Sequence, residues 1–230
     1  MNAWATHFRE HYCSDADLTV LSAATGMSRG DYLRDIKFPS TTAPGPSVRS
    51  GDFCEILVAD YIQYLLGYTV PRTRYDRKDT RDSSTKSVDV LGFRFSDPAN
   101  PGPDDELITC EVKGSLTAPA SNTLADAIDG SKKDHELRLP FALTAALLRL
   151  KDRGDAAGAT ALERFMNKTA IPYREISSAA LVCSNAGWNE ALATNSNTPH
   201  PNTNLMLIVF LGDDLMVLAN QLYELAHATA

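Results

Sequence analysis

The sequence is poor in cysteine, and its four cysteines lie far apart. Cys13, Cys54, Cys110 and Cys183 form no CxxC pair, so neither a disulfide framework nor a zinc site is expected. No apolar run approaches the roughly 18 residues that a membrane helix needs, and the polar start MNAWATHFREHY does not resemble a signal peptide. We therefore expect a cytoplasmic protein with reduced thiols and no membrane association.

The motifs of several enzyme classes are also missing. There is no Walker or dinucleotide-binding glycine loop, no GxSxG motif, and no HExxH spacing among the five histidines. ATP hydrolysis is therefore not expected of this chain. The net charge of −7 argues against a surface coated in basic residues to grip nucleic acid, although charge can be segregated locally.

Helical and strand patterns alternate along the 230 residues, which is enough chain for one domain with an appendage. Helical periodicity predicts helices within 1–37, at about 52–66, across 119–151 with a break near Gly130 or Pro140, at 156–167 and at 213–228. Strands are predicted at 68–74, 87–95, 107–115, 176–184 and 204–212. The last is a nearly unbroken apolar run and is expected in mid-sheet. The fold class is α/β, with a central mixed sheet flanked by helices.

The segment FPSTTAPGPSVRSG, residues 38–51, is rich in Pro, Ser, Thr and Gly and is typical of a linker. It predicts two parts: an N-terminal helical segment with its linker at 1–48, and a main domain at 49–230.

The stretch LITCEVKGS, residues 107–115, is typical of a buried strand but carries an acid and a base. Because side chains alternate along a strand, Glu111 and Lys113 must point to the same face. Asp89 lies in another apolar strand, SVDVLG, where an unpaired carboxylate would cost several kcal/mol to bury. On adjacent strands, Asp89 and Glu111 could bind Mg²⁺ or Mn²⁺ with a strand carbonyl such as that of Val112. Lys113 could then orient or deprotonate a metal-bound water.

Structural explanations compete with each of these roles. Glu111 and Lys113 could form a solvated ion pair, which on an edge strand would also discourage aggregation. Asp89 could be an ordinary turn or salt-bridge carboxylate. Glu55, near the start of the helix predicted at 52–66, is a third acid that could ligate the metal. It could instead complete a capping box with Asp52 at the helix start.

A basic cluster interrupts the acidic chain at residues 72–86. Its six cations are interleaved with three aspartates, giving a local net charge of +3. It could be a solvated loop with internal ion pairs, or a strip that tracks phosphates, with Tyr75 stacking on a base. For the second case the predicted nucleic-acid contacts are Arg72, Arg74, Arg77 and Lys78, extended by Lys133 at a helix.

This pattern resembles the PD-(D/E)xK nuclease superfamily, whose core is a helix, a three-strand meander, a helix and a further strand. The resemblance spans about residues 50–212. Asp89 matches the first acid, and Glu111-Val112-Lys113 matches the (D/E)xK, while Val88 stands at the motif's proline position. Glu55 matches a glutamate that many members add from the first helix. The resemblance implies a restriction-endonuclease-like core in which Asp89, Glu111 and Glu55 bind metal.

The wider context of RSGDFCEILVADYIQYLLGY, PRTRYDRK, SVDVLGF and EVKGS resembles the nuclease subunits of Hachiman-type bacterial antiphage systems, which work with a helicase. It implies a Mg²⁺-dependent endonuclease that cleaves DNA as the effector subunit of a defence complex. The alternative is a catalytically inactive nucleic-acid-binding or protein-interaction module on the same fold. RNA cleavage is a third interpretation.

Overall fold

The computed structural model describes residues 1–84, 87–117, 119–120, 122–190, 192 and 199–230. The chain packs as two compact units. The first comprises residues 1–56, 72–86 and 214–230; the second comprises 57–71 and 87–213. Packing therefore groups the first helices with the end of the chain. The predicted division into an N-terminal segment at 1–48 and a nuclease-like domain at 49–230 concerns function, and the packing units do not test it.

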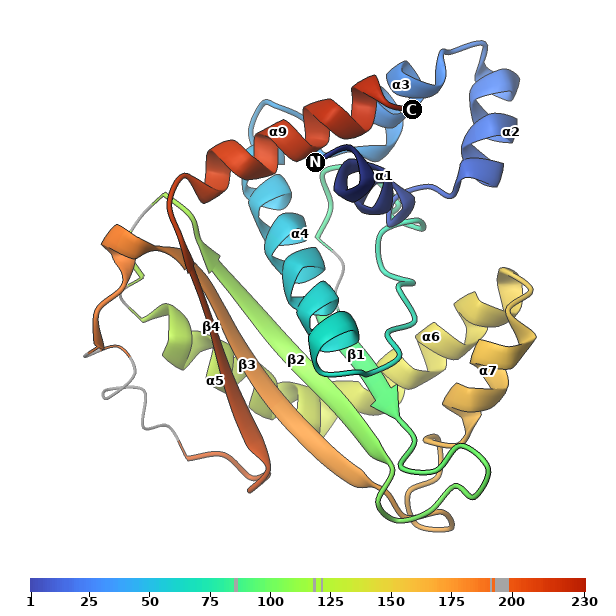
Figure 1. The fold of residues 1–230 in the computed structure, drawn as a ribbon, viewed down its shortest axis with the longest axis vertical. Helices are drawn as coiled ribbons and strands as arrows, with labels where there is room; N and C mark the ends of the chain where they lie inside the picture. The colour runs from blue at the N-terminus through green and yellow to red at the C-terminus, as the bar shows by residue number, and fades with distance from the viewer. Residues whose placement is uncertain (85–86, 118, 121, 191, 193–198) are drawn as a thin grey trace. The chain divides into compact units, whose positions relative to one another are not determined.

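The second unit is built on a four-stranded mixed sheet in the order β1-β2-β3-β4 (Figure 1). The strands are β1 (Val90–Arg94), β2 (Glu106–Ser115), β3 (Arg174–Ser184) and β4 (Leu205–Gly212). β1 and β2 form the antiparallel hairpin that the sequence predicts, with Val90 opposite Cys110, whereas β3 runs parallel to both β2 and β4. A mixed α/β fold is therefore confirmed.

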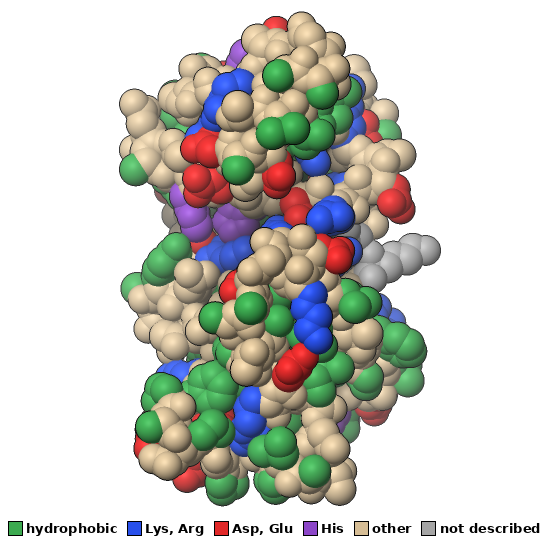
Figure 2. Space-filling view, turned by 90° about the vertical axis from the view of Figure 1, so that its right-hand side faces the viewer, with side chains coloured by type: hydrophobic (Ala, Val, Ile, Leu, Met, Phe, Trp, Pro, Cys, Tyr) green, Lys and Arg blue, Asp and Glu red, His purple; other side chains and the backbone are tan. Residues whose placement is uncertain are grey.

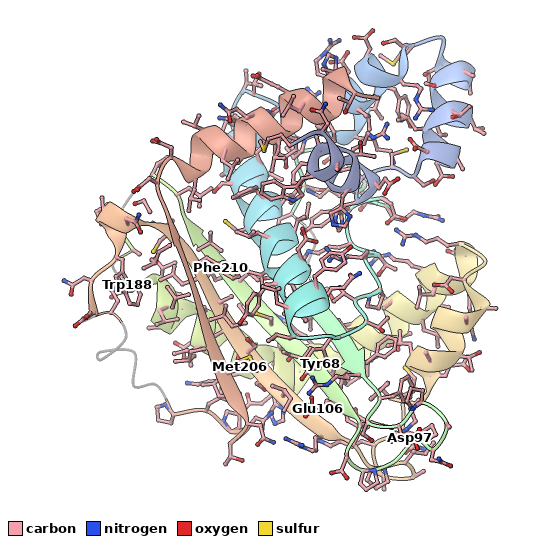
Figure 3. The ribbon with its side chains drawn as sticks, viewed as in Figure 1. Tyr68, Asp97, Glu106, Trp188, Met206 and Phe210 are labelled. Carbon is pink, nitrogen blue, oxygen red and sulfur yellow. The ribbon has the colours of Figure 1, made fainter. Side chains whose placement is uncertain are left out.

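Helical segments cover the two faces of this sheet, and the second face is covered by the end of α4 (Gly45–Asp60) and a π-helical turn (Tyr61–Leu65). On one face lie α5 (Thr123–Lys133), a π-helical turn (Asp134–Arg138), α6 (Leu139–Asp152) and α7 (Ala156–Glu163) (Figure 1). Their apolar side chains form two core clusters, one with β1 and β2 and the other with β3 and β4. Residues 57–71 pack on the opposite face, where Tyr61 makes an edge-on ring contact with Phe210 of β4 (labelled in Figure 3).

The first unit is helical and has an aromatic core. Its helices are α1 (Asn2–Glu10), α2 (Asp15–Thr25), α3 (Arg29–Tyr32) with a π-helical turn (Leu33–Lys37), the start of α4 (Gly45–Asp60), and α9 (Leu215–Ala228). Phe8, Tyr12, Phe38 and Tyr223 are all buried, and their ring centroids lie 4.9–5.2 Å apart in the contacts Phe8–Tyr223, Tyr12–Phe38 and Phe38–Tyr223. Ser14 caps α2 by accepting a hydrogen bond from Asp17 N.

Three local predictions are wrong. No strand forms over 68–74: only Thr69 pairs, with Phe93, and Arg72 has a φ of 51° that ends any extended run. The expected linker at 38–51 is helical from Gly45 onward, because a proline in the first turn of a helix loses no hydrogen bond. The apolar run expected in mid-sheet forms β4, which among the described strands lies at an edge, whereas β2 and β3 take the interior positions.

Candidate functional site

The hairpin places Asp89 next to Glu111. Asp89 precedes β1 by one residue, so the register that sets Val90 opposite Cys110 carries Asp89 toward Glu111. The Asp89 carboxylate accepts a hydrogen bond from the backbone N–H of Val112, with Oδ2 at 2.9 Å from N. The neighbouring strands thus bring together the two predicted acids and the predicted backbone ligand.

Glu111 and Lys113 point to the same face of β2, as alternation predicts. Lys113 Nζ lies 2.5 Å from Glu111 Oε1. The pair is not a solvated one, because the Glu111 side chain is only 7% exposed while that of Lys113 is 38% exposed. A buried carboxylate with a half-exposed ammonium beside it differs from the surface ion pairs that contribute little to stability.

The helical layer supplies further groups that face Glu111. Arg138 donates from one nitrogen, Nη1, to Glu111 Oε2 at 3.2 Å and to Asp134 Oδ1 at 3.0 Å. A Cβ added to Gly130 would lie 2.5 Å from Glu111 Cδ, so the missing side chain lets α5 approach this carboxylate. Sequence reasoning missed Asp134 and Arg138, although Gly130, Asp134 and Arg138 recur every four residues, the spacing of one helix face.

Asp134 is fully buried, and its pKa is raised to about 7. Burial is the largest cause, and the negative charges of Glu111 and Asp89 raise the pKa further, against the hydrogen bond from Arg138. Perturbed carboxylates of this kind cluster at functional sites, although structural ion-pair networks also produce them.

These residues fit a hard divalent cation. Carboxylate and carbonyl oxygens are the ligands that Mg²⁺ takes, usually one or two carboxylates with water and phosphate completing the shell. Both oxygens of Glu111 already face a positive charge, from Lys113 on one side and Arg138 on the other. Three acids, Asp89, Glu111 and Asp134, lie close enough to influence one another against these two cations. Asp89, at the end of the next strand, could share a metal with Glu111.

Another acid of β2 is satisfied by ordinary structural contacts. Glu106, at the opposite end of the strand, accepts a hydrogen bond from Tyr68 at 2.6 Å and pairs with Arg94 at 2.5 Å (Tyr68 and Glu106 are labelled in Figure 3). Its pKa is lowered: burial opposes ionisation, but Tyr68 and Arg94 outweigh it. The contrast with Asp134 separates a structural acid from the acids around Glu111.

Glu55 belongs to the first unit, where it has partners of its own. Arg74 Nε lies 2.8 Å from one Glu55 oxygen, and Tyr75 donates its hydroxyl to the same oxygen at 2.5 Å. The capping-box alternative is wrong, because α4 begins at Gly45 and both Asp52 and Glu55 lie in its interior. The predicted role of Glu55 as an auxiliary metal ligand stays a prediction, and its ion pair with Arg74 is a competing explanation for its presence.

The basic cluster at 72–86 pairs largely within the first unit. Lys78 is 4% exposed and lies 2.6 Å from Asp52, Arg74 is 12% exposed, and Tyr75 is buried. Arg72 lies 3.2 Å from a nitrogen of His11, whereas Arg77 is 52% exposed. These contacts match the alternative of a loop with internal ion pairs. On the face drawn in Figure 2, Lys and Arg side chains lie among Asp and Glu side chains.

Outside that cluster, the predicted contact Lys133 is exposed at the end of α5. Lys86, the last cation of the cluster, lies outside the described residues. Arg77 and Lys133 are thus the two predicted nucleic-acid contacts with mainly exposed side chains.

Comparison with known families gives one match. A family model described as HamA matches residues 1–226, almost the whole chain. No curated protein matches the sequence. Within the described part of the chain, no helix combines the length and the apolar character needed to cross a membrane.

Proposed function

Because the chain belongs to the HamA family, and is thus a component of a Hachiman-type antiphage defence system, we propose that it is the nuclease of that system. The proposed reaction is metal-dependent hydrolysis of DNA phosphodiester bonds. One observation carries the proposal: Glu111 is a buried carboxylate flanked by Lys113 and Arg138, with Asp89 on the adjoining strand end. This is the arrangement of acids and lysine that resembles the PD-(D/E)xK site.

Each residue has a distinct part in this proposal. Asp89, Glu111 and the Val112 carbonyl would hold Mg²⁺ or Mn²⁺, which would supply Lewis-acid activation of water and of the phosphate. Lys113, with 38% of its side chain exposed, can reach both Glu111 and a phosphate on the solvent side. It would orient the attacking water and stabilise the negative charge that develops on phosphorus-bound oxygens.

A helicase partner is proposed for the capture and movement of DNA. The chain has a net charge of −7. Within its basic cluster, Arg74 and Lys78 already form ion pairs with Glu55 and Asp52. Since DNA binding depends on neutralising phosphates with free cations, this chain is poorly equipped to hold DNA by itself. A multi-protein defence system provides the setting for an ATP-driven subunit to do so.

Cleavage assays with site variants test the proposal. Asp89→Asn and Glu111→Gln are expected to reduce cleavage of plasmid DNA in Mg²⁺ or Mn²⁺ at least about a thousandfold, a loss of about 4 kcal/mol in transition-state stabilisation. Lys113→Ala is expected to lower turnover while retaining Mn²⁺ affinity, since an ammonium repels a cation. Asp129→Asn is the matched control, because Asp129 is an exposed acid of α5 paired only with Lys132 among the contacts described.

Full activity in either carboxylate variant would overturn the assignment of the site. A wild-type complex that binds DNA in Mn²⁺ but cleaves neither DNA nor RNA would instead favour the alternative of an inactive binding module. RNA cut in preference to DNA would leave the site assignment intact and change the substrate.

A further inference from the structure

A buried carboxylate beside the candidate site lacks a donor for one of its oxygens. Asp134 has a fully buried side chain; its Oδ1 accepts from Arg138, whereas Oδ2 has no hydrogen-bond partner among the residues that the structure describes. Buried polar atoms are nearly always paired, so an orphaned carboxylate oxygen calls for a specific explanation. The ones to weigh are a bound proton, a water molecule and a cation.

The packing of α5 directs this carboxylate toward Glu111. With no side chain at Gly130, the helix comes close enough that a Cβ there would overlap the Glu111 carboxylate. Asp134 follows four residues later and therefore lies on the same side of the helix. The two carboxylates then share a single donor atom, Arg138 Nη1, at 3.0 Å from Asp134 and 3.2 Å from Glu111.

We propose that Asp134 and Glu111 form a second divalent-cation site beside the proposed Asp89–Glu111 site, and that the guanidinium of Arg138 takes the place of the cation in the free protein. Two carboxylates on either side of one positive group is the charge arrangement of a cation held by two acids. A divalent ion would bring twice the charge of Arg138 and could also ligate the unpartnered Oδ2 atom of Asp134.

The exposure of Arg138 would allow its side chain to leave this position. Its side chain is 39% exposed, and it extends from the π-helical turn Asp134–Arg138. Among the described residues of the second unit, no three His, Cys, Asp or Glu ligand atoms lie within 4.8 Å of one another, so two acids are proposed for this ion, with water completing its shell. The displaced guanidinium would then remain close to the site, where it suits a substrate phosphate, which Arg binds through two parallel hydrogen bonds.

Titration of the full chain with Mn²⁺ alone, followed by calorimetry, tests this site without any cleavage. The inference rests on the proposed function only in taking the ligand to be a divalent cation. The wild-type protein is expected to bind two Mn²⁺ ions, Asp134→Asn one, and Asp89→Asn the one held by Asp134 and Glu111. Arg138→Gln is expected to tighten the second ion about tenfold, because a competing positive charge has been removed. Asp129→Asn, on the exposed side of α5, should bind as wild type.

Each result either supports or overturns the second divalent-cation site. An unchanged stoichiometry and affinity in Asp134→Asn would overturn the second site and leave Asp134 as a protonated structural acid. If Asp134→Asn fails to fold, Arg138→Gln decides: a tighter second ion supports the site, and an unchanged or weaker one overturns it. Two Mn²⁺ ions bound as described but no cleavage of DNA or RNA would mean that the proposed function fails while the second site stands.

Discussion

Buried acids in the second unit differ in how their charge is balanced. Glu106 has dedicated partners in Tyr68 and Arg94, and these partners stabilise its ionised form. Glu111 and Asp134 instead depend on shared or half-exposed cations. A buried charge without a full set of partners is strongly destabilising. A cation that binds Glu111 and Asp134 would therefore stabilise the folded protein.

The pKa of Asp134 predicts a pH dependence of stability. Its folded-state pKa of about 7 lies above the value of about 3.9 for an unfolded chain. Between these values the folded state binds a proton that the unfolded state lacks, so the contribution of Asp134 to stability falls as pH rises toward and through 7. In EDTA, wild type should lose roughly 2–3 kcal/mol more than Asp134→Asn in free energy of unfolding from pH 5 to pH 8. Urea denaturation at both pH values measures the difference.

Equal pH profiles for the two proteins would mean that Asp134 is ionised throughout this range. Added Mn²⁺ is expected to raise the stability of wild type at pH 8 more than that of Asp134→Asn, because only the wild-type carboxylate gains a counter-ion there.

Sequence alternation places Glu111 and Lys113 together, because strand periodicity fixes which side chains share a face. The predicted hairpin then brings Asp89 beside them. Alternation could not supply Asp134 or Arg138. Those residues meet Glu111 through the packing of a helix on the sheet, which depends on long-range contacts that no local pattern encodes. Their four-residue spacing from Gly130 indicates a shared helix face but not what that face contacts.

At the scale of secondary-structure elements, the close contact between α5 and β2 depends on a glycine. Gly130→Ala would add a Cβ at 2.5 Å from Glu111 Cδ, a separation that forces the carboxylate or the helix to move. Although alanine favours helices over glycine by about 1 kcal/mol, this overlap is expected to make the variant less stable by about 1–3 kcal/mol. It should also weaken Mn²⁺ binding. Thermal or urea denaturation and calorimetry measure both effects.

Gly51 provides the matched control for that variant. It lies inside α4, and a Cβ there would meet nothing within 4 Å. Gly51→Ala should therefore show the helix propensity alone and stabilise the protein by about 0.5–1 kcal/mol. A Gly130→Ala protein that is stabilised by the same amount would show that α5 and Glu111 have room to spare.

The order of the elements was predictable to the extent that periodicity reports burial. The hairpin β1–β2, the strands β3 and β4 and the helices after β2 follow it. The start of α4 was not, because a run of Pro, Ser and Gly is typical of a linker and yet begins a helix at Gly45. The edge position of β4 was also missed, because an apolar run indicates contact with a core and not the number of neighbouring strands. Leu207 and Leu211 of that strand are 47% and 45% exposed.

For the molecule as a whole, the N-terminal segment is a structural part of the first unit. Phe8, Tyr12 and Leu33 are fully buried, and Tyr12 donates a hydrogen bond to Asp52 of α4 at 2.8 Å. Deleting residues 1–37 would thus remove much of this core, and loss of a partner after that deletion would say nothing about a docking surface. Surface substitutions that leave the core intact are needed instead.

The exposed face of α2 is the best position for such substitutions. Val20 and Leu21 are 67% and 36% exposed. They lie in the segment 1–48, outside the predicted nuclease-like domain, so we expect this segment to contact a helicase-type ATPase. Val20→Glu with Leu21→Gln should leave the melting temperature within about 2 °C of wild type, since neither side chain is buried. The pair should weaken the complex with the co-expressed ATPase at least about tenfold, because charged groups at an interface core are costly to desolvate. Co-purification of tagged protein, followed by calorimetric titration, measures the change.

Phe141→Ser, at a 77% exposed position of α6 in the second unit, is the control. A complex weakened by Phe141→Ser and untouched by the α2 variant would place the contact on the second unit, and a free monomer fully active on DNA would remove the need for a partner.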